Sequence, residues 1–168
     1  PRGTTHLSVV DRDGNAAALS VSNGEGCGRV LPGFGFMLNN MLGEPDVNPA
    51  GPERWMPGRR LSSMMAPTVL VGDDDAVVAL GSGGSSRIRS AVLQAVVNLA
   101  GYGLRGDEAV AAPRLHLEPG PDGTRLELEP GWDGAAERAA IEEADGHRVW
   151  SGPNLYFGGV HMAGRRSD

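Results

Sequence analysis

The chain begins with two runs of alternating apolar and polar residues, at 5–11 and 15–22, separated by Arg-Asp-Gly at 12–14. Alternation with a period of two is typical of a β-strand with one buried face. Asp-Gly between two such runs is a strong signal of a hairpin turn. The sequence therefore predicts an antiparallel pair in which Thr4 heads the first strand and Ser22 closes the second. Hairpin geometry would then bring the Ser22 hydroxyl toward Thr4.

A second hairpin and a helix are predicted in the middle of the chain. Apolar runs at 67–72 and 76–80 flank three consecutive aspartates at 73–75. These suit a solvated turn better than a metal site, because adjacent carboxylates in a turn do not all converge. From residue 88 to residue 99, apolar positions recur at i, i+3, i+4, i+7, i+8 and i+11, which predicts one amphipathic helix. Ser85 or Ser86 is the expected N-cap of this helix.

The rest of the chain is less regular. Residues 23–35 form a glycine-rich loop, and the proline-containing stretch 41–60 is expected to lie over the active-site side. Further strands are expected at 36–40, 114–118, 124–129, 148–150, 155–160 and 161–163, and helices at 106–112 and 134–144. This pattern predicts a single α+β domain over residues 1–168. Its first half is nearly all strand with few covering helices, so we infer that another polypeptide covers part of the sheet.

Composition excludes several classes of function. The net charge is −6 and every basic residue is an arginine, so the chain is a poor candidate for binding nucleic acid or an anionic membrane. The absence of lysine removes a Schiff base, a lysine general base and a phosphate-binding P-loop. Cys27 is the only cysteine and the four histidines lack metal-ligand spacing, so neither a cofactor nor a metal is expected. No apolar stretch approaches the roughly 20 residues of a membrane-spanning helix.

The Gly3–Thr4 bond is the chemically informative position at the start of the first strand. If this bond is cut, Thr4 carries a hydroxyl nucleophile and a free α-amine whose unperturbed pKa is about 7.7–8.0. Such an amine can activate the hydroxyl of its own residue. Residues 1–3 would then be a remnant of a propeptide. The glycine-rich loop at 81–86, between a strand and a helix, offers backbone N–H groups suited to a developing oxyanion.

Four separated motifs occur in a fixed order: Thr-Thr-His-Leu-Ser-Val-Val-Asp at 4–11, Leu-Asn-Asn at 38–40, Arg-Leu-Ser-Ser-Met at 60–64, and Gly-Ser-Gly-Gly-Ser-Ser-Arg-Ile at 81–88. Together they resemble the small, C-terminal subunit of γ-glutamyltranspeptidase, over roughly residues 4–159. The resemblance implies an αββα four-layer sandwich of the N-terminal-nucleophile hydrolase type, completed by the large subunit of the same precursor. It also implies cleavage of γ-glutamyl amides such as glutathione, with transfer of the γ-glutamyl group to water or an amino acid.

The resemblance assigns roles to individual residues. Thr4 would be the nucleophile released by autoproteolysis, and Ser22 the hydroxyl residue bonded to its amine. The backbone N–H groups of Gly84 and Ser85 would form the oxyanion hole. Ser62 and Ser63 would hold the α-carboxylate of the substrate, although both could also be serines of a turn with no role in binding.

This sequence departs from the family pattern where the glutamyl end is recognised. A family asparagine that binds the α-carboxylate aligns with Gly24, and the adjacent Asn23 is the candidate substitute. A family acid or amide becomes Met41. The aspartate that holds the α-amine becomes Glu44, which could still pair with an ammonium group but could also be a solvated loop charge.

Two alternatives stay open, the first because of these departures at Met41 and Glu44. One is a related acylase for another amide, such as a glutaryl-β-lactam or poly-γ-glutamate. The other is a non-catalytic relative that binds γ-glutamyl compounds or supports assembly, because the Thr4 nitrogen is an amide while residues 1–3 remain attached. The residues of this chain do not indicate a compartment; the resemblance implies a periplasmic or secreted location, as in most of the family, with a cytoplasmic location as the alternative.

Overall fold

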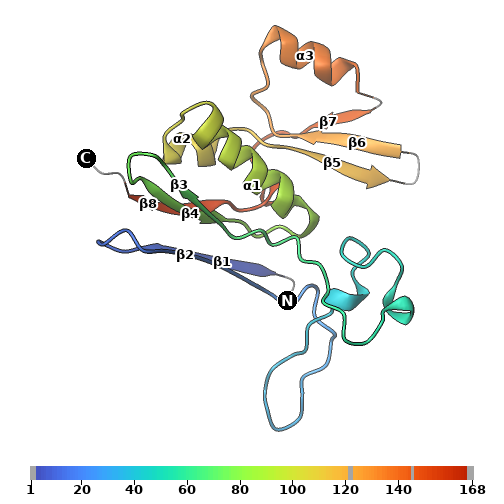
Figure 1. Ribbon diagram of the computed structural model, residues 1–168. Coiled ribbons are helices and arrows are strands. Elements are labelled where there is room, and N and C mark those ends of the chain that lie inside the picture. Colours follow the sequence, from blue (N-terminus) through green and yellow to red (C-terminus); the bar gives the residue numbers. More distant parts are fainter. Residues whose placement is uncertain (1–2, 121–122, 145, 166–168) are drawn as a thin grey trace.

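The computed structural model describes residues 3–120, 123–144 and 146–165 (Figure 1). Of the expected propeptide remnant 1–3, only Gly3 lies inside these ranges. Strands β1 (Thr4–Val10) and β2 (Ala16–Ser22) pair antiparallel, with Thr4 opposite Ser22. The predicted first hairpin is therefore confirmed, including its register.

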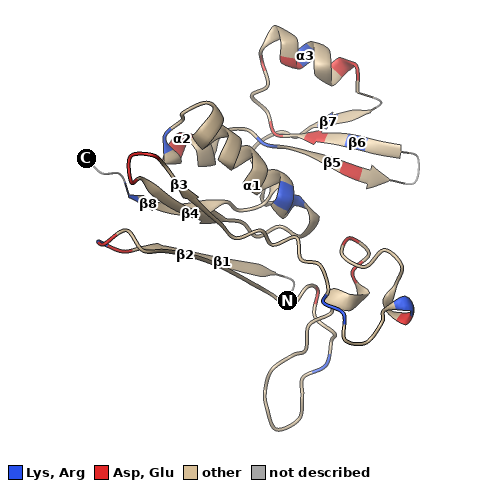
Figure 2. Ribbon diagram, viewed as in Figure 1, with Lys and Arg blue, Asp and Glu red and all other residues tan. Residues whose placement is uncertain are grey.

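The second sheet lies beside this hairpin. Strands β3 (Thr68–Val71), β4 (Val77–Gly81) and β8 (His161–Arg165) form an antiparallel sheet in the order β3-β4-β8. The aspartates at 73–75 form the exposed turn between β3 and β4, coloured red in Figure 2. β1 contacts both β4 and β8, so the two sheets form adjacent layers.

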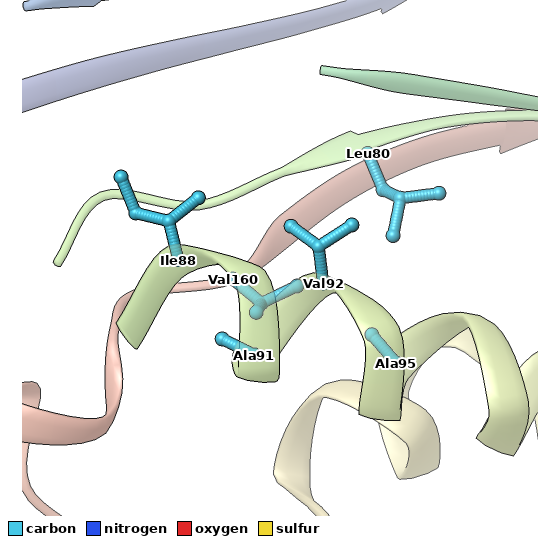
Figure 3. Close-up of a cluster of buried hydrophobic side chains, with 6 residues drawn as sticks. All are labelled: Leu80, Ile88, Ala91, Val92, Ala95 and Val160. Atoms are coloured by element: carbon cyan, nitrogen blue, oxygen red, sulfur yellow. The ribbon is translucent and has the colours of Figure 1, made fainter. Parts of the chain in front are cut away.

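Two helices cover the other side of this central sheet. Helix α1 (Ile88–Val96) carries the predicted apolar stripe and packs it on β4, and the shorter α2 (Gly106–Ala111) lies beside it (Figure 1). The resulting core cluster consists of Leu80, Ile88, Ala91, Val92, Ala95 and Val160 (Figure 3). Burial of each larger side chain in this cluster stabilises the fold by about 1.5–3 kcal/mol. The core thus fixes the start of α1, and with it the loop that leads into the helix.

The predicted capping of this helix is wrong. A 3₁₀ turn, η3 (Ser85–Arg87), precedes α1, and neither Ser85 nor Ser86 caps it by a side-chain hydrogen bond. The Ser86 hydroxyl is instead buried and accepts a hydrogen bond from the Arg87 guanidinium at 3.0 Å. The helix ends at Val96 and continues as a π-helical turn, η4 (Val97–Gly101).

The C-terminal half adds a third sheet. Strands β5 (Leu115–Gly120) and β6 (Gly123–Leu128) pair antiparallel, and β7 (His147–Val149) joins β6 in parallel after helix α3 (Ala135–Glu142). These elements follow the predicted order.

Two predicted strands are absent from the described chain. Residues 36–40 contribute only an isolated bridge between Val30 and Met37, because the surrounding glycines turn the backbone away from a continuous ladder. Residues 155–160 begin as a 3₁₀ turn, η5 (Leu155–Phe157), which the Asn154 side chain caps. Two further turns, η1 (Met41–Gly43) and η2 (Pro52–Arg54), lie in the long loop expected at 41–60.

The β1–β2 hairpin has its apolar face turned outward. Leu7, Val9, Leu19 and Val21 are each 48–57% exposed. The face toward the central sheet carries polar residues instead, among them Thr4, His6 and Ser20. A half-buried sheet normally hides its apolar face. The described residues thus supply three layers of an α+β sandwich and leave the outer face of the hairpin without a cover.

Candidate active site

A cavity of about 670 Å³ opens where the start of β1 meets the loop after β4. Its walls include five of the residues singled out from the sequence: Thr4, Ser22, Glu44, Gly84 and Ser85. They come from four separate places in the chain, namely the two ends of the first hairpin, the long loop, and the start of the 3₁₀ turn before α1. The fold therefore gathers these residues into one site.

Thr4 and Ser22 are joined directly. The Thr4 hydroxyl donates a hydrogen bond to the Ser22 hydroxyl oxygen at 3.0 Å, and the same oxygen accepts the Gly24 N–H at 3.0 Å. Because Ser22 is itself held by the backbone of the following turn, it fixes the direction of the Thr4 side chain. The predicted approach of the two hydroxyls is confirmed.

The loop after β4 packs tightly against the start of β1. A Cβ atom on Gly83 would lie 2.8 Å from the Thr4 carbonyl oxygen, so only glycine allows this approach. Gly84 follows with φ +131°, and Ser85 adopts φ +55°. The left-handed conformation costs a non-glycine residue roughly 1–2 kcal/mol. Through this bend, the backbone of Gly84 and Ser85 forms part of the wall of the cavity that Thr4 also lines.

Glu44 brings a carboxylate into the same cavity. Its side chain is half-buried, and burial raises the pKa of this carboxyl, with the charges of Glu25 and Asp46 acting in the same direction. The Glu25 N–H donates to the carboxylate and opposes that rise in pKa. A Cβ atom on Gly24 would collide with Glu44 Oε1. A carboxylate in this position suits a substrate ammonium group.

Three predicted substrate residues stand apart from this set. Among the described residues, the cavity walls include Gly24 and Met64, the chain neighbours of Asn23 and Ser63, but not Asn23, Ser62 or Ser63. Ser62 and Ser63 are exposed. The Ser63 hydroxyl accepts the Met65 N–H at 3.2 Å, as a turn serine does. Their substrate-binding roles remain predictions.

Sequence reasoning did not single out His6 and His161, which also line the cavity. The His6 ring lies between the hydroxyls of Ser20 and Ser8, each at 2.8 Å, and burial lowers its pKa, with the nearby His161 adding to the effect. His161 Nε2 lies 2.7 Å from the His6 carbonyl oxygen. The signal was present in the alternation of β1, which places His6 on the same face as Thr4.

The described residues contain no group of His, Cys, Asp and Glu that could hold a metal ion, and no helix long and apolar enough to cross a membrane. The site as it stands consists of a hydroxyl pair, a bent glycine loop and a carboxylate.

The fold, with a threonine at the head of a strand that packs on a second sheet beside a glycine loop, is that of the N-terminal-nucleophile hydrolases. The chain belongs to the gamma-glutamyltranspeptidase family, whose model matches residues 1–168. The resemblance noted from the sequence motifs and the α+β fold class are both confirmed.

Individual relatives agree with this membership. The chain is 40% identical over 134 residues to the glutathione hydrolase proenzyme of Escherichia coli K12, covering 73% of this chain and 23% of that protein. It is 35% identical over 119 residues to the acylase ACY 1 proenzyme of Pseudomonas sp. SE83, covering 70% of this chain and 21% of that protein.

A solved structure shows the same fold. The T380A mutant of gamma-glutamyltranspeptidase from Helicobacter pylori superposes with a TM-score of 0.71 at 28% identity, covering 96% of this chain and 97% of that one.

Proposed function

We propose that this chain is the nucleophile-bearing region of a γ-glutamyltransferase and glutathione hydrolase. The observation that carries the proposal is the hydrogen bond from Thr4 to Ser22, in a cavity that also holds Glu44 and the bent loop at Gly84 and Ser85. The geometry offers a nucleophile, a hydroxyl that orients it, candidate oxyanion donors and a carboxylate for an ammonium group.

The first step is cleavage of the Gly3–Thr4 bond. The Thr4 hydroxyl oxygen attacks the Gly3 carbonyl carbon, and the acyl group moves from nitrogen to oxygen to give an ester. Water then hydrolyses the ester, leaving a carboxylate on Gly3 and a free α-amine on Thr4. This step supplies the base, because the amide nitrogen of an uncut chain cannot accept a proton at neutral pH.

In the second step the free α-amine takes the hydroxyl proton while Thr4 Oγ1 attacks the amide carbonyl of the donor substrate. The negative charge that develops on the carbonyl oxygen faces the N–H groups of Gly84 and Ser85. The amine leaves with a proton, and a γ-glutamyl ester of Thr4 remains. Attack on this ester by water gives hydrolysis, and attack by an amino acid gives transfer.

Recognition of the glutamyl end would involve Glu44 for the α-ammonium group. Asn23, Ser62 and Ser63 are proposed for the α-carboxylate, on the strength of the sequence motif. The chain spans only 23% of the length of its Escherichia coli relative, so further contacts would come from the rest of a precursor. The exposed apolar face of the β1–β2 hairpin is the surface on which we place that large N-terminal subunit.

A second candidate function is hydrolysis of an amide without an α-ammonium group. Met41 in the cavity wall and the similarity to an acylase proenzyme favour it. Turnover of γ-glutamyl anilide should be compared with that of glutaryl anilide by the assembled enzyme. A clear preference for the first supports the proposed function, whereas equal rates favour the acylase.

The experiment that tests the nucleophile is an intact mass with N-terminal sequencing of a precursor that joins this segment to its natural upstream half. A small chain that begins at Thr4 is expected, together with no cleavage in Thr4→Ala. An uncut wild-type precursor, or unchanged activity in assembled Thr4→Ala, would favour the non-catalytic alternative.

A further inference from the structure

The segment between β7 and β8 packs directly behind the candidate oxyanion loop. The Gly159 N–H donates to the Gly83 carbonyl at 3.2 Å. A Cβ atom on Gly84 would lie 2.8 Å from Gly158 Cα, and one on Gly158 would lie 2.9 Å from the Gly83 carbonyl oxygen. Since backbone meets backbone on both sides, a shift of the segment must displace the loop.

Arg87 ties this segment to the loop from the other side. Its backbone N–H donates to the Gly84 carbonyl at 3.2 Å, and its Nε–H donates to the Tyr156 carbonyl at 3.1 Å. The guanidinium carbon lies 4.7 Å from the centroid of the Tyr156 ring, which gives a cation–π contact. Although Arg87 borders the cavity, its guanidinium is engaged with the protein itself. We refer to Arg87 and Tyr156 together as the clamp.

Tyr156 is in turn held by the third sheet. Its hydroxyl donates to Glu118 Oε2 at 2.8 Å, and its ring stacks on Trp150 at 4.8 Å between centroids. The Trp150 Nε1–H donates to the fully buried carboxylate of Glu127 at 2.7 Å. Arg148 completes the stack, with its guanidinium carbon 4.6 Å from the Trp150 ring. The β5–β6–β7 sheet is thereby connected, through one stack of side chains, to the start of α1.

We propose that Tyr156 is a positioning residue that acts through Arg87, so that the clamp holds the N–H groups of Gly84 and Ser85 in place relative to Thr4. This inference rests on the proposed acyl transfer. Oxyanion donors must lie within 2.7–3.1 Å of the developing charge, and removal of one donor costs roughly 10²–10³-fold in kcat. A clamp that only orients the donors should matter less than the donors themselves. Its arginine is not replaceable by lysine, because only a planar guanidinium can both stack and donate from Nε.

The test uses the assembled enzyme made from the full precursor, with γ-glutamyl anilide as substrate. Tyr156→Leu removes the ring but keeps the carbonyl that Arg87 binds, and Tyr156→Phe keeps the ring. Arg148→Met is the matched control, because Arg148 reaches the same stack through Trp150 and not through the loop. We expect Tyr156→Leu to lower kcat about tenfold with KM unchanged, and Tyr156→Phe and Arg148→Met to stay within about twofold of wild type. Arg87→Lys keeps the positive charge but loses the planar stacking and the Nε donation, so it should also lower kcat about tenfold.

A rise in KM without a fall in kcat would overturn the proposal, because the clamp would then be a substrate contact. Equal losses in Tyr156→Leu and Arg148→Met would also overturn it, since the stack would merely support the sheet. Hydrogen exchange at residues 83–87 gives a readout that does not require turnover. Faster exchange in Tyr156→Leu than in Arg148→Met supports the clamp even if the wild-type protein has no γ-glutamyl activity, a result that would sink only the proposed function. Equal exchange in the two variants would contradict the clamp.

Discussion

The carboxylate of Glu44 occupies the space that a side chain on Gly24 would need. The two positions lie 20 residues apart in the sequence, and a side chain on Gly24 would require the Glu44 carboxylate to move. Gly24 has φ +60°, a backbone conformation that asparagine also adopts readily. An asparagine at this position would therefore test the side-chain collision with little added backbone strain.

Gly24→Asn should displace Glu44 and weaken recognition of an ammonium group. We expect KM for γ-glutamyl anilide to rise about tenfold relative to KM for glutaryl anilide, which corresponds to about 1.4 kcal/mol. Both substrates share the carboxylate that an asparagine here could bind, and only the first carries the ammonium group. Gly28→Asn is the matched control, because Gly28 lies in the same loop at φ +75° with open space around it. The double variant Gly24→Asn/Glu44→Asp should recover part of the loss, since the shorter acid leaves room. Equal effects on both substrates would show that Glu44 does not bind the ammonium group.

Ser22→Ala should release the Thr4 side chain from its fixed orientation. It also leaves the Gly24 N–H without its hydroxyl partner. We expect slower cleavage at Gly3–Thr4 and a fall of roughly 10–100-fold in kcat/KM. Ser20→Ala is the control on the same face of β2, because Ser20 contacts His6 and not Thr4. If both alanine variants lose the same activity, the effect comes from the hairpin as a whole.

Gly84→Ala should lower the activity strongly, whereas Ser85→Gly should leave it nearly unchanged. Gly84 has φ +131° and meets Gly158, so alanine must push the two backbones apart, with an expected loss of about 100-fold in kcat. Ser85→Gly removes a left-handed serine and keeps its N–H, so we expect kcat within about twofold of wild type and no loss of stability. Steady-state kinetics and thermal unfolding check both. A large loss of activity in Ser85→Gly would mean that the serine hydroxyl itself takes part.

Stability should fall in mild acid because of His6. Burial lowers the pKa of this histidine below its unfolded value of 6.5, so the unfolded state binds more protons between the two pKa values. The stabilisation is fully present above 6.5 and is lost as the pH falls through the lowered pKa. His6→Gln should flatten this part of the profile when the Tm of the assembled protein is followed from about pH 8 to about pH 5. His116 also has its pKa lowered by burial, so His116→Gln shows how much of the slope belongs to each residue.

Local patterns in the sequence predicted much of the fold. The Thr4–Ser22 register followed from alternation and an Asp-Gly turn, and α1 followed from its apolar stripe. What could not be predicted depends on contacts between distant residues. Ser86 fails to cap α1 because Arg87 engages its hydroxyl, and Arg87 is directed by a carbonyl 69 residues away. The 3₁₀ turn at Leu155–Phe157 likewise exists because Asn154 caps it and Phe157 is buried.

The candidate site was predictable to a similar degree. The order of the motifs predicted five site residues, and all five line one cavity. No local pattern, however, indicated that the Glu44 carboxylate would lie beside Gly24. Ser62, Ser63 and Asn23 lie outside the cavity walls, and their substrate-binding roles stay predictions that rest on the sequence motif.

The outward apolar face of the β1–β2 hairpin also bears on the timing of maturation. A two-stranded hairpin is marginally stable alone, and a contiguous exposed apolar face invites association or aggregation. The strand that begins with Thr4 therefore depends on its cover to stay flat against the central sheet. We expect the precursor to break its own chain only after the two halves have folded together. In that order of events the unpartnered hairpin serves as a quality control, because a misassembled precursor would never release the amine that makes it an enzyme.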